Sequence, residues 1–177
     1  WEYTLGATAP QYNGTGICFV SGWDNNQYGI SYDPYAGGGT IRAFVNASPT
    51  TIQSGLGSVS SGDIIAVALD CDAQTVKWYK NNVQVGTTVT YTSYLPSGST
   101  TVWPAWWTAN AIGASCDVNF GQRPFSYTPP SGYNRLQTYN LPTPTIGASS
   151  TTLANKYFDV SLYTGDRKST RLNSSHV

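Results

Sequence analysis

Short segments in which apolar and polar residues alternate recur along the chain, and this period of two constrains the fold more than any other feature. Side chains alternate between the two faces of a β-strand, whereas an α-helix repeats every 3.6 residues, a spacing almost absent here. Gly, Asn, Asp and Pro separate the segments, as is typical of turns. The pattern predicts strands in WEYTL, TGICFV, IRAFV, GDIIAVALD, TVKWYK, VQVGTTV, TVWPAWW and CDVNFG.

The connections between these segments indicate antiparallel pairing. CDAQ separates GDIIAVALD from TVKWYK, and Asn81-Asn82, a pair that tolerates positive φ, separates TVKWYK from the next strand. Residues 62–87 are therefore expected to form a three-stranded meander. Because many short antiparallel strands bury their core between two sheets, we predict an all-β, antiparallel two-sheet β-sandwich.

The length of 177 residues exceeds one typical domain of about 100 to 150 residues. We expect the sandwich to occupy residues 1–140, with its N-terminus truncated because the chain starts at Trp1 and contains no Met. A Pro-spaced linker and the strand-like YFDVSLYTG would make residues 141–166 the start of a second, truncated domain. DRKSTRLNSSHV resembles translated adapter sequence in assembled sequencing data, so residues 167–177 are expected to be a non-native tail and are set aside.

Charge and composition exclude several classes of partner. The formal net charge is zero and no segment gathers Lys or Arg, so the basic patch that nucleic-acid binding requires is missing. No apolar run approaches the roughly 20 residues of a spanning helix, so no membrane insertion is expected. The cysteines Cys18, Cys71 and Cys116 match no zinc spacing and are interpreted as reduced thiols, with one disulfide as the alternative. We expect no metal and no cofactor.

The residues needed for common catalytic sites are also scarce. The only histidine, His176, lies in the tail that was set aside, which excludes Ser-His-Asp and Cys-His arrangements. Paired carboxylates, as in glycosidases, remain open, but Glu2 is the only Glu and the Asp residues fall mostly at strand ends and turns. Asp70 and Asp72 lack the further oxygen ligands of a calcium loop and are interpreted as turn residues. The chain is therefore predicted not to be an enzyme.

GDIIAVALDCDAQTVKWYKNNVQVGTT, followed by VWPAWW and VNFGQRPFSYTPPSGY, resembles a SPRY domain. In that family a strand with an acidic end leads through a hairpin into an aromatic-Tyr-Lys-Asn-Gly turn, and a Pro-containing strand and a closing Asn-Phe-Gly follow. Asn82 stands where the family usually has Gly. The resemblance covers about residues 1–140 and implies a concanavalin-like jelly roll that binds protein partners through loops at one end. VNFGQRPF would then be the last strand and its exit, with Phe120 in the core, a bend at Gly121, and Arg123 ordering the exit.

NLPTPTI and YFDVSLYTG are similar to segments that follow SPRY-like domains in bacteriophage structural proteins and related metagenomic sequences. This shorter resemblance implies a piece of a virion or tail-associated protein, made in the bacterial cytoplasm and assembled into the phage particle. The partner would be another virion protein or a host-surface glycan, and the oligomeric state stays open.

The residues 21–40 and 46–61 are predicted to be long loops, and aromatic and amide side chains crowd the first of them. Flat rings beside amides stack on sugars or anchor a protein partner, and loops on a β scaffold carry binding residues. The alternative is that half of these rings cover the core. Strand alternation places Trp103 and Trp107 on one face and Trp106 on the other, and at least one face must be core. The candidate ligand-binding residues are Trp23, Asn25, Tyr28, Tyr32, Asp33, Tyr35 and Trp107.

Three functions follow from these observations. The leading hypothesis is a non-catalytic interaction module of a phage structural or tail-associated protein. Its competitor is a lectin-like carbohydrate-binding module, favoured by the aromatic and amide content of residues 21–40. A glycoside-acting enzyme is the third, and it depends on a carboxylate pair that is not evident in the sequence.

Overall fold

The computed structural model describes residues 1–8, 13–20, 28–34, 38–108, 113–136 and 140. The chain divides into two units, Trp1–Asn140 and Leu141–Val177, and every described residue belongs to the first. The expected linker, second-domain strand and tail thus lie outside the described residues.

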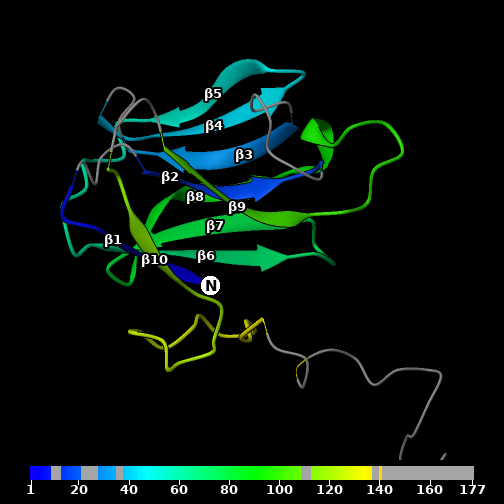
Figure 1. Ribbon diagram of the computed structural model, residues 1–177. Coiled ribbons are helices and arrows are strands. Elements are labelled where there is room, and N and C mark those ends of the chain that lie inside the picture. Colours follow the sequence, from blue (N-terminus) through cyan, green and yellow to red (C-terminus); the bar gives the residue numbers. More distant parts are fainter. Residues whose placement is uncertain (9–12, 21–27, 35–37, 109–112, 137–139, 141–177) are drawn as a thin grey trace, which may run out of the picture. The chain divides into compact units, whose positions relative to one another are not determined.

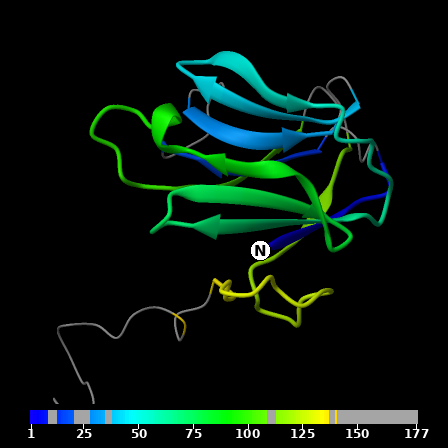
Figure 2. The ribbon, with the colours of Figure 1, turned by 180° about the vertical axis from the view of Figure 1, so that it is seen from behind.

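The described strands form two antiparallel sheets of five, which lie one over the other (Figures 1 and 2). The predicted all-β sandwich is therefore confirmed. Sheet A has the order β10(Cys116–Asn119), β1(Glu2–Leu5), β6(Ile64–Asp70), β7(Thr75–Lys80), β8(Val83–Thr90). Sheet B has the order β5(Ser48–Ser54), β4(Thr40–Val45), β3(Tyr28–Asp33), β2(Asn13–Cys18), β9(Trp103–Thr108). A short 3-10 helix, η3(Thr92–Tyr94), follows β8.

The core lies between the inner faces of the sheets, and its aromatic residues join them by hydrogen bonds. Trp78 of β7 is 0% exposed, and its indole Nε1 donates to the backbone oxygen of Thr15 in β2 at 2.9 Å. Tyr3 of β1 donates its hydroxyl to the backbone oxygen of Ala105 in β9 at 2.9 Å. Each ring thus buries a large apolar area while its polar atom is satisfied.

The predicted meander is confirmed. β6 pairs with β7 and β7 with β8, and the two-residue turn between the last two has positive φ at Asn81 (48°) and Asn82 (69°). Two positive φ values define the turn whose twist matches that of a hairpin, and Asn adopts them at low cost.

The edges β5 and β8 are joined by a side chain. The amide of Gln53 in β5 donates from Nε2 to the Thr87 backbone oxygen at 3.2 Å and accepts from the Thr87 backbone N–H at 2.8 Å. Gly86, with φ +67°, lies at an irregularity of β8 where an added Cβ would meet Gln53. This contact occupies edge groups that would otherwise be open to another strand.

The prediction of two long loops is wrong in part. β3 lies within residues 21–40, and β5 lies within residues 46–61. YGISYD does alternate, because Ile30 and Tyr32 enter the core while Gly29 and Ser31 face outward, but its Gly and Asp suggested a loop. β5 is an exposed edge strand rich in hydroxyl side chains, so it lacks the apolar period of a core strand.

Candidate functional site

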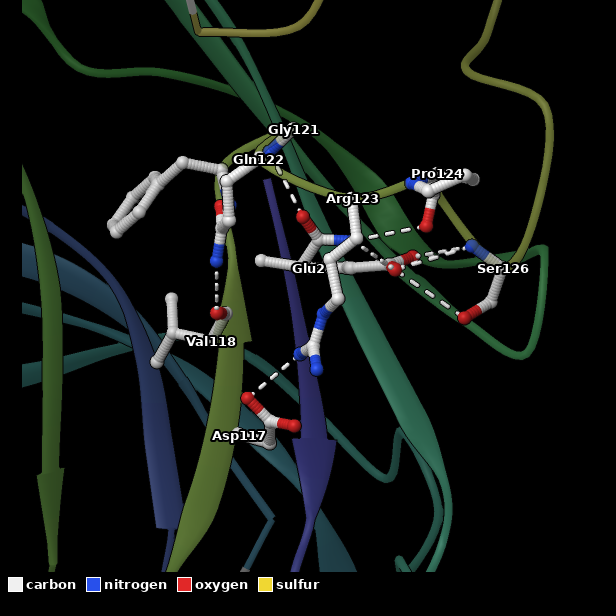
Figure 3. Close-up of polar contacts among 10 residues, drawn as sticks. Glu2, Asp117, Val118, Gly121, Gln122, Arg123, Pro124 and Ser126 are labelled. Atoms are coloured by element: carbon white, nitrogen blue, oxygen red, sulfur yellow. Dashed lines mark hydrogen bonds and ion pairs between the residues drawn. The ribbon is translucent and has the colours of Figure 1, made fainter.

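The outer face of sheet A, the face turned away from the core, is bonded to the segment that follows β10. We call residues 120–136 the strap; in both overall views it runs below β6 (Figures 1 and 2). The Glu2 carboxylate, on a residue only 5% exposed, accepts from Asn119 Nδ2 at 3.0 Å and from the Ser126 backbone N–H at 3.1 Å. The Ser126 hydroxyl adds a third donor at 3.2 Å (Figure 3).

The beginning of the strap is ordered by contacts within itself and with β10. Gln122 accepts from the Phe120 N–H at 2.7 Å and donates to the Val118 oxygen at 2.9 Å. Arg123 forms an ion pair with Asp117 at 2.7 Å (Figure 3). Both partners are at least half exposed, so this pair contributes little stability. Its position agrees with the expectation that Arg123 orders the exit.

Two features of this exit were predicted, with different outcomes. Gly121 has a φ of +113°, and an added Cβ would lie 2.7 Å from the Cβ of Arg135, so the bend at a glycine is confirmed. Phe120 does not enter the core as predicted; it is half-buried, and its ring lies 6.4 Å from that of Trp1. The reason is that β10 ends one residue earlier, at Asn119.

The later part of the strap makes further contacts. The Lys77 ammonium, on β7, lies 5.4 Å from the centre of the Tyr133 ring, and the Arg135 guanidinium lies 5.6 Å from the Phe125 ring. A cation near a ring face is attracted by the ring quadrupole. The chain itself thus engages Glu2, Asp117 and Lys77 on sheet A's outer face, which indicates a structural role for these contacts.

The outer face of sheet B is different, because small residues occupy its centre. The inner face is marked by Ile17, Ile30 and Ile41, which are 0% exposed in the core. Alternation places the neighbouring positions outward, and the register aligns them: Ser31 pairs with Gly16 and with Arg42, and Gly16 pairs with Ala105. The outward residues are Thr40, Arg42 and Phe44 of β4, Gly29, Ser31 and Asp33 of β3, Gly14, Gly16 and Cys18 of β2, and Trp103, Ala105 and Trp107 of β9.

Two aromatic rings meet above these small residues. Phe44 of β4 and Trp107 of β9 lie edge to face with ring centroids 6.2 Å apart, although β3 and β2 separate their strands. A Cβ added to Gly14 would lie 2.1 Å from the Trp107 indole. The absence of side chains at the glycines therefore allows the rings to approach across the sheet.

An ion pair lies on the same face. Arg42 Nη1 is 3.4 Å from Asp33 Oδ2, and the two side chains are 33% and 9% exposed respectively. The pair carries no net charge, so it does not attract one sign of ligand charge over the other. A largely buried carboxylate beside a partly exposed guanidinium provides both hydrogen-bond acceptors and donors.

Three buried side-chain polar atoms of the described residues lack a hydrogen-bond partner: Thr15 Oγ1, Ser31 Oγ and Arg42 Nε. All three belong to sheet B, but Ser31 and Arg42 face outward whereas Thr15 pairs with Tyr32 and faces the core. Buried polar groups are nearly always paired, so each exception requires a reason. The outer face of sheet B therefore holds bonding capacity that the described residues do not use.

The structure brings together two of the residues predicted to bind a ligand. Asp33 and Trp107 both face outward on sheet B. Tyr28 packs against the core, and Tyr32 is 0% exposed with its hydroxyl donating to the Gly57 oxygen at 3.1 Å. Burial, with a smaller effect of the Asp63 and Asp33 charges, raises the pKa of Tyr32 to about 12. The remaining candidates, Trp23, Asn25 and Tyr35, lie outside the described residues.

The three tryptophans of β9 divide between the faces as alternation predicts. Trp103 and Trp107 face outward, and Trp106, paired with Thr15, faces inward. Trp103 is 47% exposed and Trp106 is 38% exposed, because β9 is an edge strand, a position that also tolerates Pro104. The Trp106 indole donates to Asn13 Oδ1 at 3.0 Å, whereas Trp103 presents an exposed ring on the outer face.

The described residues contain no cluster of three or more His, Cys, Asp or Glu that could hold a metal ion. Asp70 Oδ1 accepts from the backbone N–H groups of Asp72 and Ala73, which confirms the turn interpretation. Cys18, Cys71 and Cys116 are all free. No helix in the described ranges is long and apolar enough to cross a membrane.

The residues predicted to bind a ligand did not include Ser31, Arg42, Phe44 or Trp103 of this face. A signal for them existed, because Arg42 and Phe44 alternate with Ile41 and Ala43 in the predicted strand IRAFV. Ser31 would have been found had YGISYD been assigned as a strand. No known protein-family model matches this chain, and no curated protein matches it.

Proposed function

We propose that residues 1–140 form a SPRY-like, non-catalytic binding module of a phage structural or tail-associated protein, contacting another virion protein or the host envelope. The observation that supports binding is the outer face of sheet B, where Ser31 Oγ and Arg42 Nε lack partners on the same face as the exposed ring of Trp103. The family and the phage setting rest on the sequence resemblances described above. Because a fold alone says little about function, the proposal depends on this face.

The test is direct binding by the full chain. Immobilised protein is exposed to purified virion proteins, to bacterial envelope fractions and to a glycan panel, and saturable binding to one class is expected. A Trp23→Ala variant with unchanged circular dichroism tests the predicted loop contribution, since loss of binding would place residues 21–27 in the site. A folded protein that binds none of these classes would overturn the proposal.

A lectin-like carbohydrate-binding module is the second candidate. It is favoured by the combination of an exposed tryptophan ring with the hydrogen-bonding pair Asp33 and Arg42 on one face. The same glycan panel reports on it. Release of sugar that disappears when a single Asp is replaced would instead identify a glycoside-acting enzyme.

A further inference from the structure

We propose that the outer face of sheet B binds a neutral saccharide, which stacks on Trp103 and forms hydrogen bonds with Ser31 and Arg42. This inference rests on the proposed binding function and names its ligand class and its site. It places the site on strand residues of the sheet, whereas the sequence placed it in the segment 21–40.

The first argument is the pairing of polar groups. Ser31 is 0% exposed and its Oγ has no partner, and the adjacent Arg42 on β4 has an unpaired Nε. A buried polar atom without a partner carries a desolvation penalty that a bound group of suitable chemistry removes. Two such atoms on neighbouring strands of one face favour a ligand over an isolated packing defect.

The second argument concerns what kind of group fits. Arg42 can only donate, the Asp33 carboxylate can only accept, and the Ser31 hydroxyl can do both. A ligand hydroxyl also does both, so adjacent hydroxyls can accept from the guanidinium and donate to the carboxylate. Since Asp33 and Arg42 balance each other's charge at 3.4 Å, this ion pair favours no phosphate or sulfate over a neutral hydroxyl.

The third argument is the exposed ring beside a floor of small residues. Cys18 pairs with both Gly29 and Trp103, and Gly16 pairs with both Ser31 and Ala105, so two adjacent rows cross the sheet. Three strand spacings, about 14 Å, separate β4 from β9. Phe44 and Trp107 already meet across this span, so a ligand ring with its apolar C–H face on Trp103 must displace that ring pair or pack against it.

Access to Ser31 requires a local change. The serine is buried, while the Arg42 side chain that neighbours it is 33% exposed. Binding is thus expected to move the Arg42 side chain and the Phe44 and Trp107 rings that meet above the small residues, and to bring the guanidinium onto the saccharide. The associated change in the environment of Trp103 provides a fluorescence signal.

The chain offers a matched control on the opposite face. Thr15 in β2 also has a buried hydroxyl without a partner, but it faces the core. Ser31→Ala and Thr15→Val each remove one unpaired hydroxyl from sheet B. Removing an unpaired buried hydroxyl should leave stability nearly unchanged, so the two variants are expected to fold alike and differ only in binding.

The experiment titrates the full chain with neutral oligomers of glucose, mannose, galactose and N-acetylglucosamine, and with a sulfated oligosaccharide, following tryptophan fluorescence. We expect saturable binding of at least one neutral oligomer, a Kd raised at least tenfold by Ser31→Ala, and no change with Thr15→Val. Trp103→Ala, at an exposed position, should also raise the Kd and keeps the test informative if Ser31→Ala fails to fold.

The other outcomes separate this inference from the proposed function. Neutral saccharide binding that survives both Ser31→Ala and Trp103→Ala would place the site elsewhere and overturn the inference while leaving a binding module. Exclusive binding of the sulfated oligosaccharide, or of a virion or envelope protein, would overturn the ligand class alone. Absence of binding to every probe by the folded chain would overturn both.

Discussion

Sheet A and sheet B differ in how their outer faces use buried polar groups. On sheet A, the buried Glu2 carboxylate is satisfied by Asn119 and by Ser126 of the strap. On sheet B, Ser31 Oγ and Arg42 Nε remain without partners, although both strands are central to the sheet. A face whose donors and acceptors are matched within the chain serves stability, whereas a face with unmatched groups has capacity for a ligand.

The residue types explain this difference. The outer face of sheet A carries functional groups long enough to reach the strap, such as Glu2 and Lys77. The centre of sheet B's outer face has glycines at 14, 16 and 29, which supply no side chain to cover a neighbour. The glycines thus offer no side-chain partner to Ser31 and Arg42, the unmatched groups of sheet B's outer face.

The largest expected effect on stability comes from the core that lies between the two sheets. Trp78→Ala removes a fully buried ring and its hydrogen bond to Thr15, and is expected to lower the free energy of unfolding by about 3–5 kcal/mol. Urea unfolding of the full chain measures it. Trp103→Ala, at a ring that is 47% exposed, should cost less than about 1 kcal/mol. Equal losses in the two variants would contradict the burial of Trp78.

The next largest effect is expected on the outer face of sheet A, where the buried Glu2 carboxylate is hydrogen-bonded within the chain. Glu2→Ala leaves the Ser126 backbone N–H without its acceptor and Asn119 Nδ2 with the Pro124 oxygen alone, and is expected to cost about 2–3 kcal/mol in urea unfolding. Glu2→Gln retains one acceptor oxygen and should cost less. A Glu2→Ala variant as stable as the unchanged chain would show that the strap is not held by this contact.

Ser126, which contacts sheet A, and Ser31 of sheet B allow a direct comparison of the two outer faces. Ser126→Ala removes a hydroxyl that donates to Glu2 and is expected to cost about 1 kcal/mol, while Ser31→Ala removes an unpaired hydroxyl and should change stability by less than about 0.5 kcal/mol. Paired thermal and urea unfolding curves measure both. If Ser31→Ala proved the more destabilising of the two, its hydroxyl would have a partner within the chain.

The smallest expected effect is a difference in the rates at which the three cysteine thiols react. Cys71 is exposed, whereas burial raises the pKa of Cys116 to about 11 and raises the pKa of Cys18 as well. Because the thiolate is the reactive form, a disulfide reagent at pH 8 should label Cys71 first and the other two much more slowly. Cys18 faces outward on sheet B, so labelling of Cys18 as fast as that of Cys71 would show that this face is open.

Much of the fold was predictable because its signals are local. The period of two identified eight strands, and the Asn81-Asn82 turn set the register of β7 and β8. The candidate site was less predictable. Asp33 and Trp107 were selected from the sequence and do lie on one outer face, but Tyr32 was selected as a loop residue and lies in the core. Aromatic content alone does not distinguish a core ring from a surface ring.

The sequence by itself determined the alternation of each strand, the hairpin turns and the division of Trp103, Trp107 and Trp106 between two faces, because these depend on neighbouring residues. Only the tertiary structure decided which strands are neighbours. It placed Ser31 beside Arg42 and Gly16, and brought Trp107 onto Gly14 from more than 90 residues away. Pairing between distant strands depends on packing of the whole core, and a face acquires its chemistry only when that pairing is complete.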